Sequence, residues 1–179
     1  SAIGFGLGVT IGDVNRDGWQ DIFVSNDFFE RDYLYINQQN GTFKESITEQ
    51  IQALSKSSMG ADMADLTNDG FPEIYVTDMM PRTESRLKTT MTFDSWETYQ
   101  RMIENDYHYQ FTRNVLQLNT GVIESEDSIP TVHFDEIGRL TAVHATDWSW
   151  GALVFDFTND GYKDIFVANG IRHDITDQD

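Results

Sequence analysis

The fold is decided by the stretch GVTIGDVNRDGWQDIFVSN, which runs from Gly8 to Asn26. It contains an acidic loop of the form Asp-x-Asn-x-Asp-Gly, followed by an aromatic residue, an acid and the apolar triplet IFV. Two further stretches align with it without gaps: GADMADLTNDGFPEIYVTD, from Gly60 to Asp78, and GALVFDFTNDGYKDIFVAN, from Gly151 to Asn169. A pattern that recurs in this way marks an array of similar structural units, so we interpret the chain as repetitive.

The residues around each loop predict four strands per unit. The apolar triplets after the loops and the alternating segment YLYIN at 33–37 are typical of strands. Asn40 and Gly41 predict a hairpin turn that leads into a fourth strand. Four strands per unit, recurring at about 50 residues, are typical of a β-propeller blade. We therefore expect an all-β fold built from four-stranded antiparallel blades.

The repeats divide the chain into about two and a half blades. The first blade is expected over residues 1–57 with its loop at 13–21, and the second over 58–148 with its loop at 65–73. A partial third blade is expected over 149–179, with its loop at 156–164. Because propellers close with about 4 to 8 blades, we expect a fragment of a larger propeller, or a chain that partner chains complete.

The spacing of the repeats indicates an insertion in the second blade. Gly60 follows Gly8 by 52 residues, whereas Gly151 follows Gly60 by 91. We expect a small helical insertion over 80–112, with Asp94 as the helix N-cap. The residues that share one helical face are Trp96, Tyr99, Gln100 and Ile103. This helix either packs against the blade edge or serves as a partner-binding arm.

Each loop offers a set of hard oxygen ligands. Side chains supply oxygens at loop positions 1, 3, 5 and 9, the backbone carbonyl supplies one at position 7, and a glycine at position 6 permits the turn. This set suits Ca²⁺, which takes 6–8 oxygens at about 2.3–2.6 Å, better than Mg²⁺. We therefore predict up to three bound Ca²⁺ ions. The predicted ligands are Asp13, Asn15, Asp17, Trp19 and Asp21; Asp65, Thr67, Asp69, Phe71 and Glu73; and Asp156, Thr158, Asp160, Tyr162 and Asp164.

Two features qualify this prediction. Thr67 and Thr158 are poorer ligands than Asn15 at position 3, and water can take their place. An EF-hand would need a bidentate glutamate at position 12 and flanking helices. Position 12 is a valine in all three loops, and the flanks are predicted strands. The predicted role of calcium is therefore structural rather than that of a switching sensor.

Composition narrows the classes of function. The formal net charge of -18 disfavours nucleic acid, because phosphate binding requires a basic surface. The chain has no cysteine, which excludes disulfides and thiolate metal sites. No apolar run is long enough to predict insertion into a membrane.

The three repeats and their flanking segments, including RNVLQLN and TDWSWGALVFD, resemble FG-GAP/VCBS repeats. Such repeats form the calcium-loop blades of integrin α-like propellers and of many bacterial surface proteins. The chain looks most similar to bacterial secreted proteins related to cartilage acidic protein, which often carry an ASPIC/UnbV domain. The resemblance implies calcium ligands at the positions named above. It also implies an extracellular, periplasmic or cell-surface location.

Two classes of function fit this resemblance. The first is a binding or adhesion module for a glycan or a surface protein, with Trp148 and Trp150 either stacking on sugars or packing between blades. The second is part of a calcium-dependent polysaccharide lyase or hydrolase. Its acid–base candidates are Asp62, Asp147, His108, His133 and His144. No recognised catalytic motif joins these residues, so the binding module is favoured and no catalytic residue is assigned.

Overall fold

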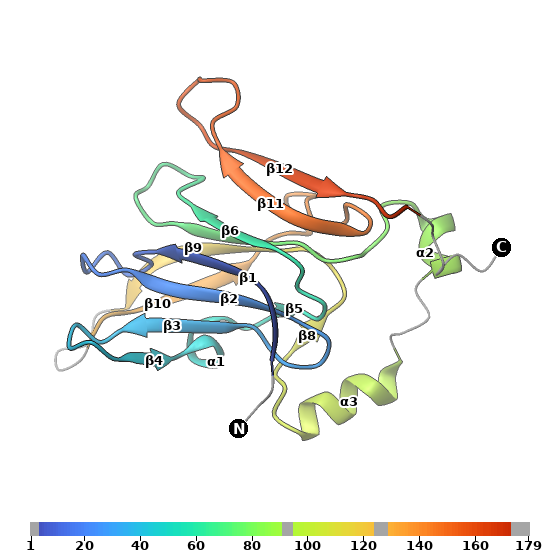
Figure 1. Ribbon diagram of the computed structural model, residues 1–179, viewed down its shortest axis with the longest axis horizontal. Coiled ribbons are helices and arrows are strands. Elements are labelled where there is room, and N and C mark those ends of the chain that lie inside the picture. Colours follow the sequence, from blue (N-terminus) through green and yellow to red (C-terminus); the bar gives the residue numbers. More distant parts are fainter. Residues whose placement is uncertain (1–3, 91–94, 124–128, 173–179) are drawn as a thin grey trace.

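The computed structural model describes residues 4–90, 95–123 and 129–172. Three antiparallel sheets follow one another in chain order, and helical segments project at one end (Figure 1). The prediction of an all-β fold made of propeller-type blades is confirmed. The described sheets form a stack of blades rather than a closed ring.

The first blade contains four strands in sequence order. They are β1 (Phe5–Gly12), β2 (Asp21–Asp27), β3 (Tyr33–Asn37) and β4 (Phe43–Glu45). Each strand pairs with the next in antiparallel register, as in Phe23 with Leu34. The helix α1 (Ile47–Gln50) then leads the chain out of the blade.

The second blade repeats this topology, and the third shows its first two strands. The second sheet orders β6 (Ala61–Ala64), β7 (Glu73–Val76), β9 (Val115–Ile123) and β10 (Thr131–Glu136), all antiparallel. In the described part of the third unit, β11 (Ser149–Phe155) pairs with β12 (Asp164–Asn169). The acidic loops join β1 to β2, β6 to β7 and β11 to β12.

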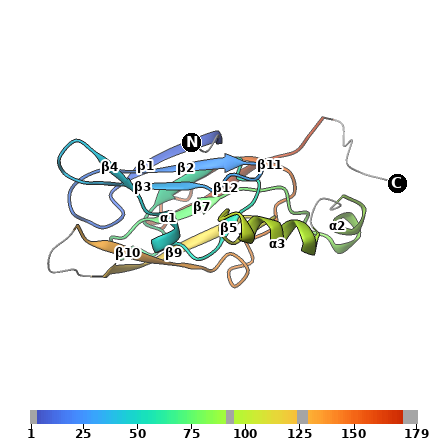
Figure 2. The same ribbon diagram turned by 90° about the horizontal axis from the view of Figure 1, so that it is seen from below.

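The helical insertion between β7 and β9 is present. It contains α2 (Glu84–Thr90), α3 (Trp96–Glu104) and the short strand β8 (Gln110–Phe111), which pairs in parallel with β5 (Leu54–Ser55). Figure 2 shows α3 extending from the end of the blades beside β5.

The start of α3 differs from the prediction. Ser95, not Asp94, is the N-cap, and its Oγ accepts a hydrogen bond from the Thr98 N–H at 3.1 Å. A serine hydroxyl satisfies an N–H of the first helical turn as well as a carboxylate does, which explains the shift by one residue. Asp94 lies outside the described residues. Along α3, Met102 is the buried side chain, whereas Trp96 remains 69% exposed.

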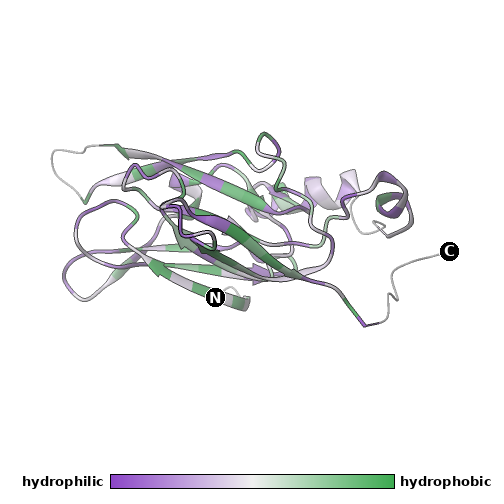
Figure 3. Ribbon diagram, turned by 90° about the horizontal axis from the view of Figure 1, so that it is seen from above, coloured by the Kyte–Doolittle hydropathy of each residue, from purple (hydrophilic) through white to green (hydrophobic). Residues whose placement is uncertain are grey.

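Two hydrophobic clusters hold the blades together. One lies between the first and second sheets and includes Phe23, Leu34 and Phe134, none of which has exposed surface. The other lies between the second and third sheets, around Tyr75 and Val154. The hydropathy view shows apolar and polar residues alternating along the strands of the blades (Figure 3). Burial of apolar side chains between sheets is the main force that stacks the blades.

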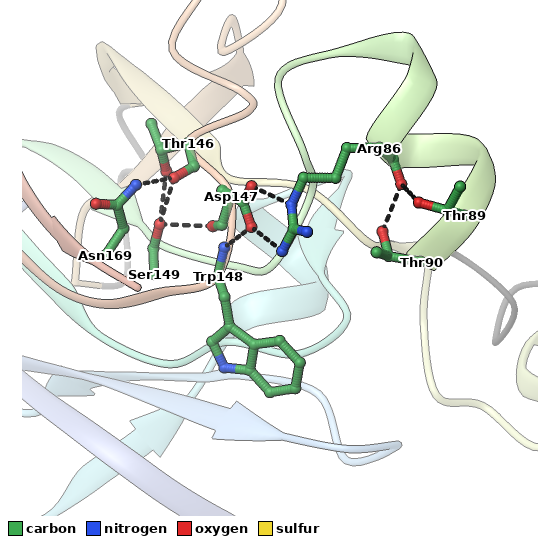
Figure 4. A network of polar contacts seen from close by, with 8 residues as sticks. All are labelled: Arg86, Thr89, Thr90, Thr146, Asp147, Trp148, Ser149 and Asn169. Atoms are coloured by element: carbon green, nitrogen blue, oxygen red, sulfur yellow. Dashed lines mark hydrogen bonds and ion pairs between the residues drawn. The ribbon is translucent and has the colours of Figure 1, made fainter. Parts of the chain in front are cut away.

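The helix α2 is attached to the third blade by an ion pair. Arg86 donates from Nε to Asp147 Oδ2 at 2.5 Å, and from a terminal nitrogen to Oδ1 at 3.2 Å (Figure 4). Asp147 is positioned in turn by its own N–H, which donates to the Met80 carbonyl at 2.9 Å. Both contacts hold the N-terminal part of the insertion against the segment that precedes β11.

Both outer faces of the stack are apolar and exposed. On β1, alternate residues point away from the second blade; they are Phe5, Leu7, Val9 and Ile11, each more than half exposed. The third sheet exposes Leu153, Phe155 and Phe166. Exposed apolar surface of this extent marks an interaction face. Among the described residues, no helix has the length and apolar character needed to cross a membrane.

Candidate metal sites in the repeat loops

The backbone of the three acidic loops has one conformation. Position 4 is left-handed in each loop, at Arg16 (φ 57°), Asn68 (φ 60°) and Asn159 (φ 57°). The glycine at position 6 is also left-handed, as at Gly18, where φ is 88°. Glycine and asparagine adopt such angles at low cost, which fits position 6 of every loop and position 4 of the second and third loops. Arg16 adopts the same angle at a cost in the first loop.

The aspartate at position 1 closes each turn. One Asp13 oxygen accepts from the Asp17 N–H at 3.1 Å, and the other accepts from the Gly18 N–H at 2.8 Å. Asp65 and Asp156 make the same pair of bonds in the second and third loops. Because each oxygen of a carboxylate accepts more than one bond, these contacts leave further acceptor capacity.

The acids at positions 5 and 9 also repeat their contacts. At position 5, Oδ1 accepts from the N–H of position 7, as from Trp19 to Asp17 at 2.9 Å. At position 9, one carboxylate oxygen accepts from the N–H of position 2, as from Val14 to Asp21 at 3.0 Å. Each loop therefore contains the same set of hydrogen bonds. Every aspartate and glutamate among the predicted ligands accepts bonds of this set.

The acids at position 9 of the first two loops are deeply buried. Asp21 has no exposed surface, and burial raises its pKa to about 6, aided by the nearby charges of Asp17 and Asp13. Burial likewise raises the pKa of Glu73. The Oε1 atom of Glu73 is buried without a hydrogen-bond partner. A buried carboxylate oxygen that lacks a donor is a position where a cation is favourable.

The side chains are not gathered into a preformed metal cluster. Among the residues that the structure describes, no three acidic or histidine side chains come together as a metal-holding group. The loops instead direct several oxygens at their own backbone N–H groups. The donor set fits calcium in its chemistry, since it is made of hard oxygens and includes the unpartnered oxygen of Glu73.

Position 3 differs between the loops in its burial and contacts. Asn15 is 3% exposed; its Oδ1 accepts from the Asp17 N–H, and its Nδ2 donates to the Pro130 carbonyl at 2.9 Å. Thr67 and Thr158 are exposed. Asn15, a predicted ligand, therefore also connects the first loop to the second blade.

Neighbouring loops also touch one another. The Arg16 guanidinium lies 5.0 Å from the centre of the Phe71 ring, which joins the first loop to the second. Asn68 Nδ2 donates to the Gly161 carbonyl at 3.1 Å and joins the second loop to the third. All three loops thus lie at the same end of the stacked blades.

Sequence reasoning missed two asparagines that support the loops. Asn37 Nδ2 donates to the Gln20 carbonyl at 3.2 Å, and Asn119 Nδ2 donates to the Pro72 carbonyl at 3.3 Å. Both therefore bind the carbonyl at position 8 from the third strand of their blade, Asn37 at the end of β3 and Asn119 in the middle of β9. The signal was present, because YLYIN and VLQLN both end in asparagine at equivalent places.

The acid–base candidates lie in different parts of the structure, and most of them make structural contacts. Asp62 accepts from the Val154 N–H at 2.7 Å and links the second and third blades. The His108 ring contacts the Ile51 carbonyl at 2.8 Å, and His133 pairs with Asp135 at 3.2 Å. Asp147 is bound by Arg86, as described above. His144 Nδ1 is buried without a partner.

The two candidate tryptophans lie together on the third blade. The Trp148 and Trp150 rings are 6.2 Å apart at an angle of 35°. Trp150 is half exposed and donates from Nε1 to the Gly170 carbonyl at 2.8 Å. Trp148 is partly buried beside the network of Figure 4. Trp150 therefore retains an open face, whereas Trp148 packs against the blade.

Fold and loops together define a class: antiparallel propeller-type blades, each carrying the same acidic turn between its first two strands. Comparison with known proteins agrees. The family model described as "FG-GAP-like repeat" matches residues 13–76, from the first loop to the end of β7.

Curated relatives include integrin α chains. The chain is 32% identical to mouse integrin alpha-3 over 83 residues, which is 40% of this chain and 8% of that protein. It is 34% identical to human integrin alpha-6 over 86 residues, 42% of this chain and 8% of that protein. For mouse integrin alpha-7 the identity is 37% over 84 residues, 41% of this chain and 7% of that protein. The chain thus spans less than a tenth of these relatives. The finer resemblance to bacterial relatives of cartilage acidic protein stays a prediction.

Proposed function

We propose that the chain is a calcium-stabilised part of a β-propeller that acts outside the cell as a binding or adhesion module. The observation that carries this proposal is the set of hydrogen bonds that recurs in each of the three loops. In every loop, the predicted acidic ligand at a given position accepts from the backbone N–H of the equivalent position. A turn preserved in three copies at one end of the blades is a specialised feature, since plain turns vary freely.

Calcium supplies a physical reason for these loops. Burial of Asp21 and Glu73 disfavours their charged forms, and the neighbouring loop aspartates add repulsion. A bound divalent cation would offset both effects and would make the net charge of -18 less negative. Weak extracellular sites with Kd of about 10⁻⁴–10⁻³ M are filled at millimolar calcium. Each filled site would then add about 1 kcal/mol to the free energy of unfolding.

The exposed outer faces support a role within a larger assembly. The apolar side chains of β1 and of the third sheet are the kind that face neighbouring blades elsewhere in this chain. We propose that further blades of the parent propeller, or partner chains, cover them. A glycan or a surface protein is the proposed ligand of the assembled propeller.

The likeness to integrin α chains supports adhesion at an extracellular or cell-surface location. The interactions of the catalytic candidates favour this module over a polysaccharide-degrading enzyme. Asp62, Asp147 and His108 each bind a structural partner, in three different parts of the blades.

The calcium part of the proposal is tested by titration calorimetry on chelator-treated protein. Up to three sites should appear, and thermal melting should shift to lower temperature when EDTA is added. Glu104→Gln, an exposed carboxylate on α3 outside the loops, is the matched charge control and should bind calcium as the parent does. An absence of binding heat at millimolar calcium, together with melting that EDTA leaves unchanged, would refute a structural role for the metal.

A further inference from the structure

A pocket lies between the helical insertion and the blades. It has a cavity volume of about 530 Å³, within the range of about 300–1,000 Å³ that holds small ligands. Its walls come from α3, from β8 and the residues just after it, and from the segments that follow β5, β7 and β10. The insertion and the blades therefore build it jointly, at a place distinct from the acidic loops.

One wall of the pocket is a column of stacked rings. Trp96 and Tyr99 lie 5.5 Å apart at 25°, and Tyr99 and Phe111 lie 5.7 Å apart at 29°. The Arg113 guanidinium continues the column, 4.8 Å from the centre of the Phe111 ring. Trp96, at the outer end, is 69% exposed. The column thus presents an open indole face to a ligand, on a support that packing already holds in place.

The charge of the pocket is opposite to that of the molecule. Among the lining residues that the structure describes, three are basic, namely Lys56, Arg113 and Arg139, and none is an aspartate or a glutamate. The whole chain has 12 basic and 30 acidic residues. Arg113 is paired with Glu136 at 2.8 Å, which fixes its orientation, and Arg139 is exposed at the rim. A cationic pocket on such an acidic protein favours an anionic ligand group.

We propose that this pocket binds an acidic sugar, of the uronic acid type, within a glycan chain. The apolar face of the sugar ring stacks on Trp96 and its carboxylate is bound by the exposed Arg139 side chain. Aromatic rings bury the apolar face of a ligand, while arginine and lysine pair with carboxylates. This proposal rests on the proposed glycan-binding function and gives it a ligand class and a site.

The charge of the group that enters the pocket distinguishes this ligand from a nucleotide. A uronic acid places one carboxylate charge per ring in the pocket, which the pocket can neutralise. The phosphate of a nucleotide such as AMP brings about −1.5 to −2 charges to one group, which the field of a chain at -18 opposes more strongly. An acidic peptide supplies carboxylates but no flat ring face to match the exposed indole of Trp96.

The test uses titration calorimetry with trimers of galacturonate, glucuronate and mannuronate. It is run with and without calcium, because uronates bind calcium themselves. A galactose trimer is the neutral counterpart, and a triglutamate peptide and AMP are the competing anions. We expect at least one uronate trimer to bind, more weakly at high salt, and at least tenfold more tightly than the galactose trimer, the peptide or AMP.

Variants then locate the site. Trp96→Ala and Arg139→Gln should each weaken uronate binding at least tenfold. Both side chains are exposed, so melting temperatures should stay at the parent value. Trp150→Ala removes an exposed tryptophan outside this pocket and should leave binding unchanged. Failure of all three uronates to bind, or equal binding of the peptide or AMP, overturns the acidic-sugar assignment.

Failure of this inference is separable from failure of the proposed function. Glycan binding that Trp150→Ala abolishes and Trp96→Ala leaves intact would keep the binding module but overturn the pocket. If uronate binding depends on Trp96 but the protein binds no calcium, the proposed uronate site stands and the structural role of calcium is refuted.

Discussion

Gly60 lies backbone to backbone against Gly151. A Cβ atom placed on Gly60 would be 2.9 Å from the Gly151 Cα and 2.9 Å from the Trp150 carbonyl oxygen. Gly8 faces Gly60 in the same way, with its hypothetical Cβ 3.4 Å from the Gly60 Cα. The glycine that opens each repeat is therefore the point where the innermost strands of successive blades touch.

Gly60→Ala should destabilise the protein by about 1–3 kcal/mol, because the added methyl group meets rigid backbone rather than a movable side chain. Gly151→Ala is the matched control, since a Cβ there meets nothing within 4 Å. Urea unfolding of the two variants gives the comparison. Equal free energies of unfolding for the two variants would show that the blades accommodate a methyl group at Gly60 without a loss of stability.

Asp69→Asn and Asp69→Ala should distinguish the charge of the loop from its hydrogen bond. Asparagine retains an oxygen for the Phe71 N–H, whereas alanine does not. Without calcium, the alanine variant should be less stable by about 1 kcal/mol and the asparagine variant close to the parent. Both should lose one calcium site or bind it more weakly, measured by calorimetry. Undiminished calcium binding in both variants would remove Asp69 from the ligand set.

The free energy of unfolding should fall as pH rises from about 4 to 7 in calcium-free buffer. Asp32 and Asp78 are fully buried, and burial raises their pKa to about 7 and about 6. Their folded pKa values exceed that of the unfolded chain, so the folded state binds more protons and loses stability as these groups ionise. The loss for Asp32 alone is on the order of 3 kcal/mol.

Asp32→Asn should raise stability at pH 8 and flatten this pH dependence. Asparagine is suited to the position, because the second blade has Asn114 at the equivalent place. Asn114 Oδ1 accepts from the Asp78 N–H at 2.7 Å, just as Asp32 Oδ1 accepts from the Asn26 N–H at 2.8 Å. Chemical denaturation at pH 5 and pH 8 measures the effect. A variant whose pH dependence matches the parent would show that Asp32 titrates normally.

Arg86→Met should loosen the helical insertion with little change in global stability. The side chains of the Arg86–Asp147 pair are about 30% exposed, so the loss should be about 1 kcal/mol or less. Hydrogen exchange across α2 should nevertheless increase, because this pair ties the helix to the third blade. Lys88→Met breaks the more exposed pair with Glu84 and is the control. Faster exchange in the control alone would contradict the assigned anchor.

Much of the fold and of the candidate site could be predicted from the sequence, because the decisive interactions are local. The bonds from the Asp13 side chain reach residues four and five positions away, and the strand signals of residues 22–24 and 33–37 lie within single strands. The glycine at position 6 is required by the turn in each loop. Such short-range patterns recur with the repeat, which makes them visible in the chain.

The remainder depended on residues distant in the chain. The contact of Gly60 with Gly151, the burial of Asp32 and the pocket beside Trp96 combine segments that no local pattern connects. The sequence by itself determined the repeat, the strands and the composition of the acidic loops, since these follow from neighbouring residues. Only the tertiary structure decided which faces are covered and which groups lose water, because burial is a property of packed blades rather than of any one segment.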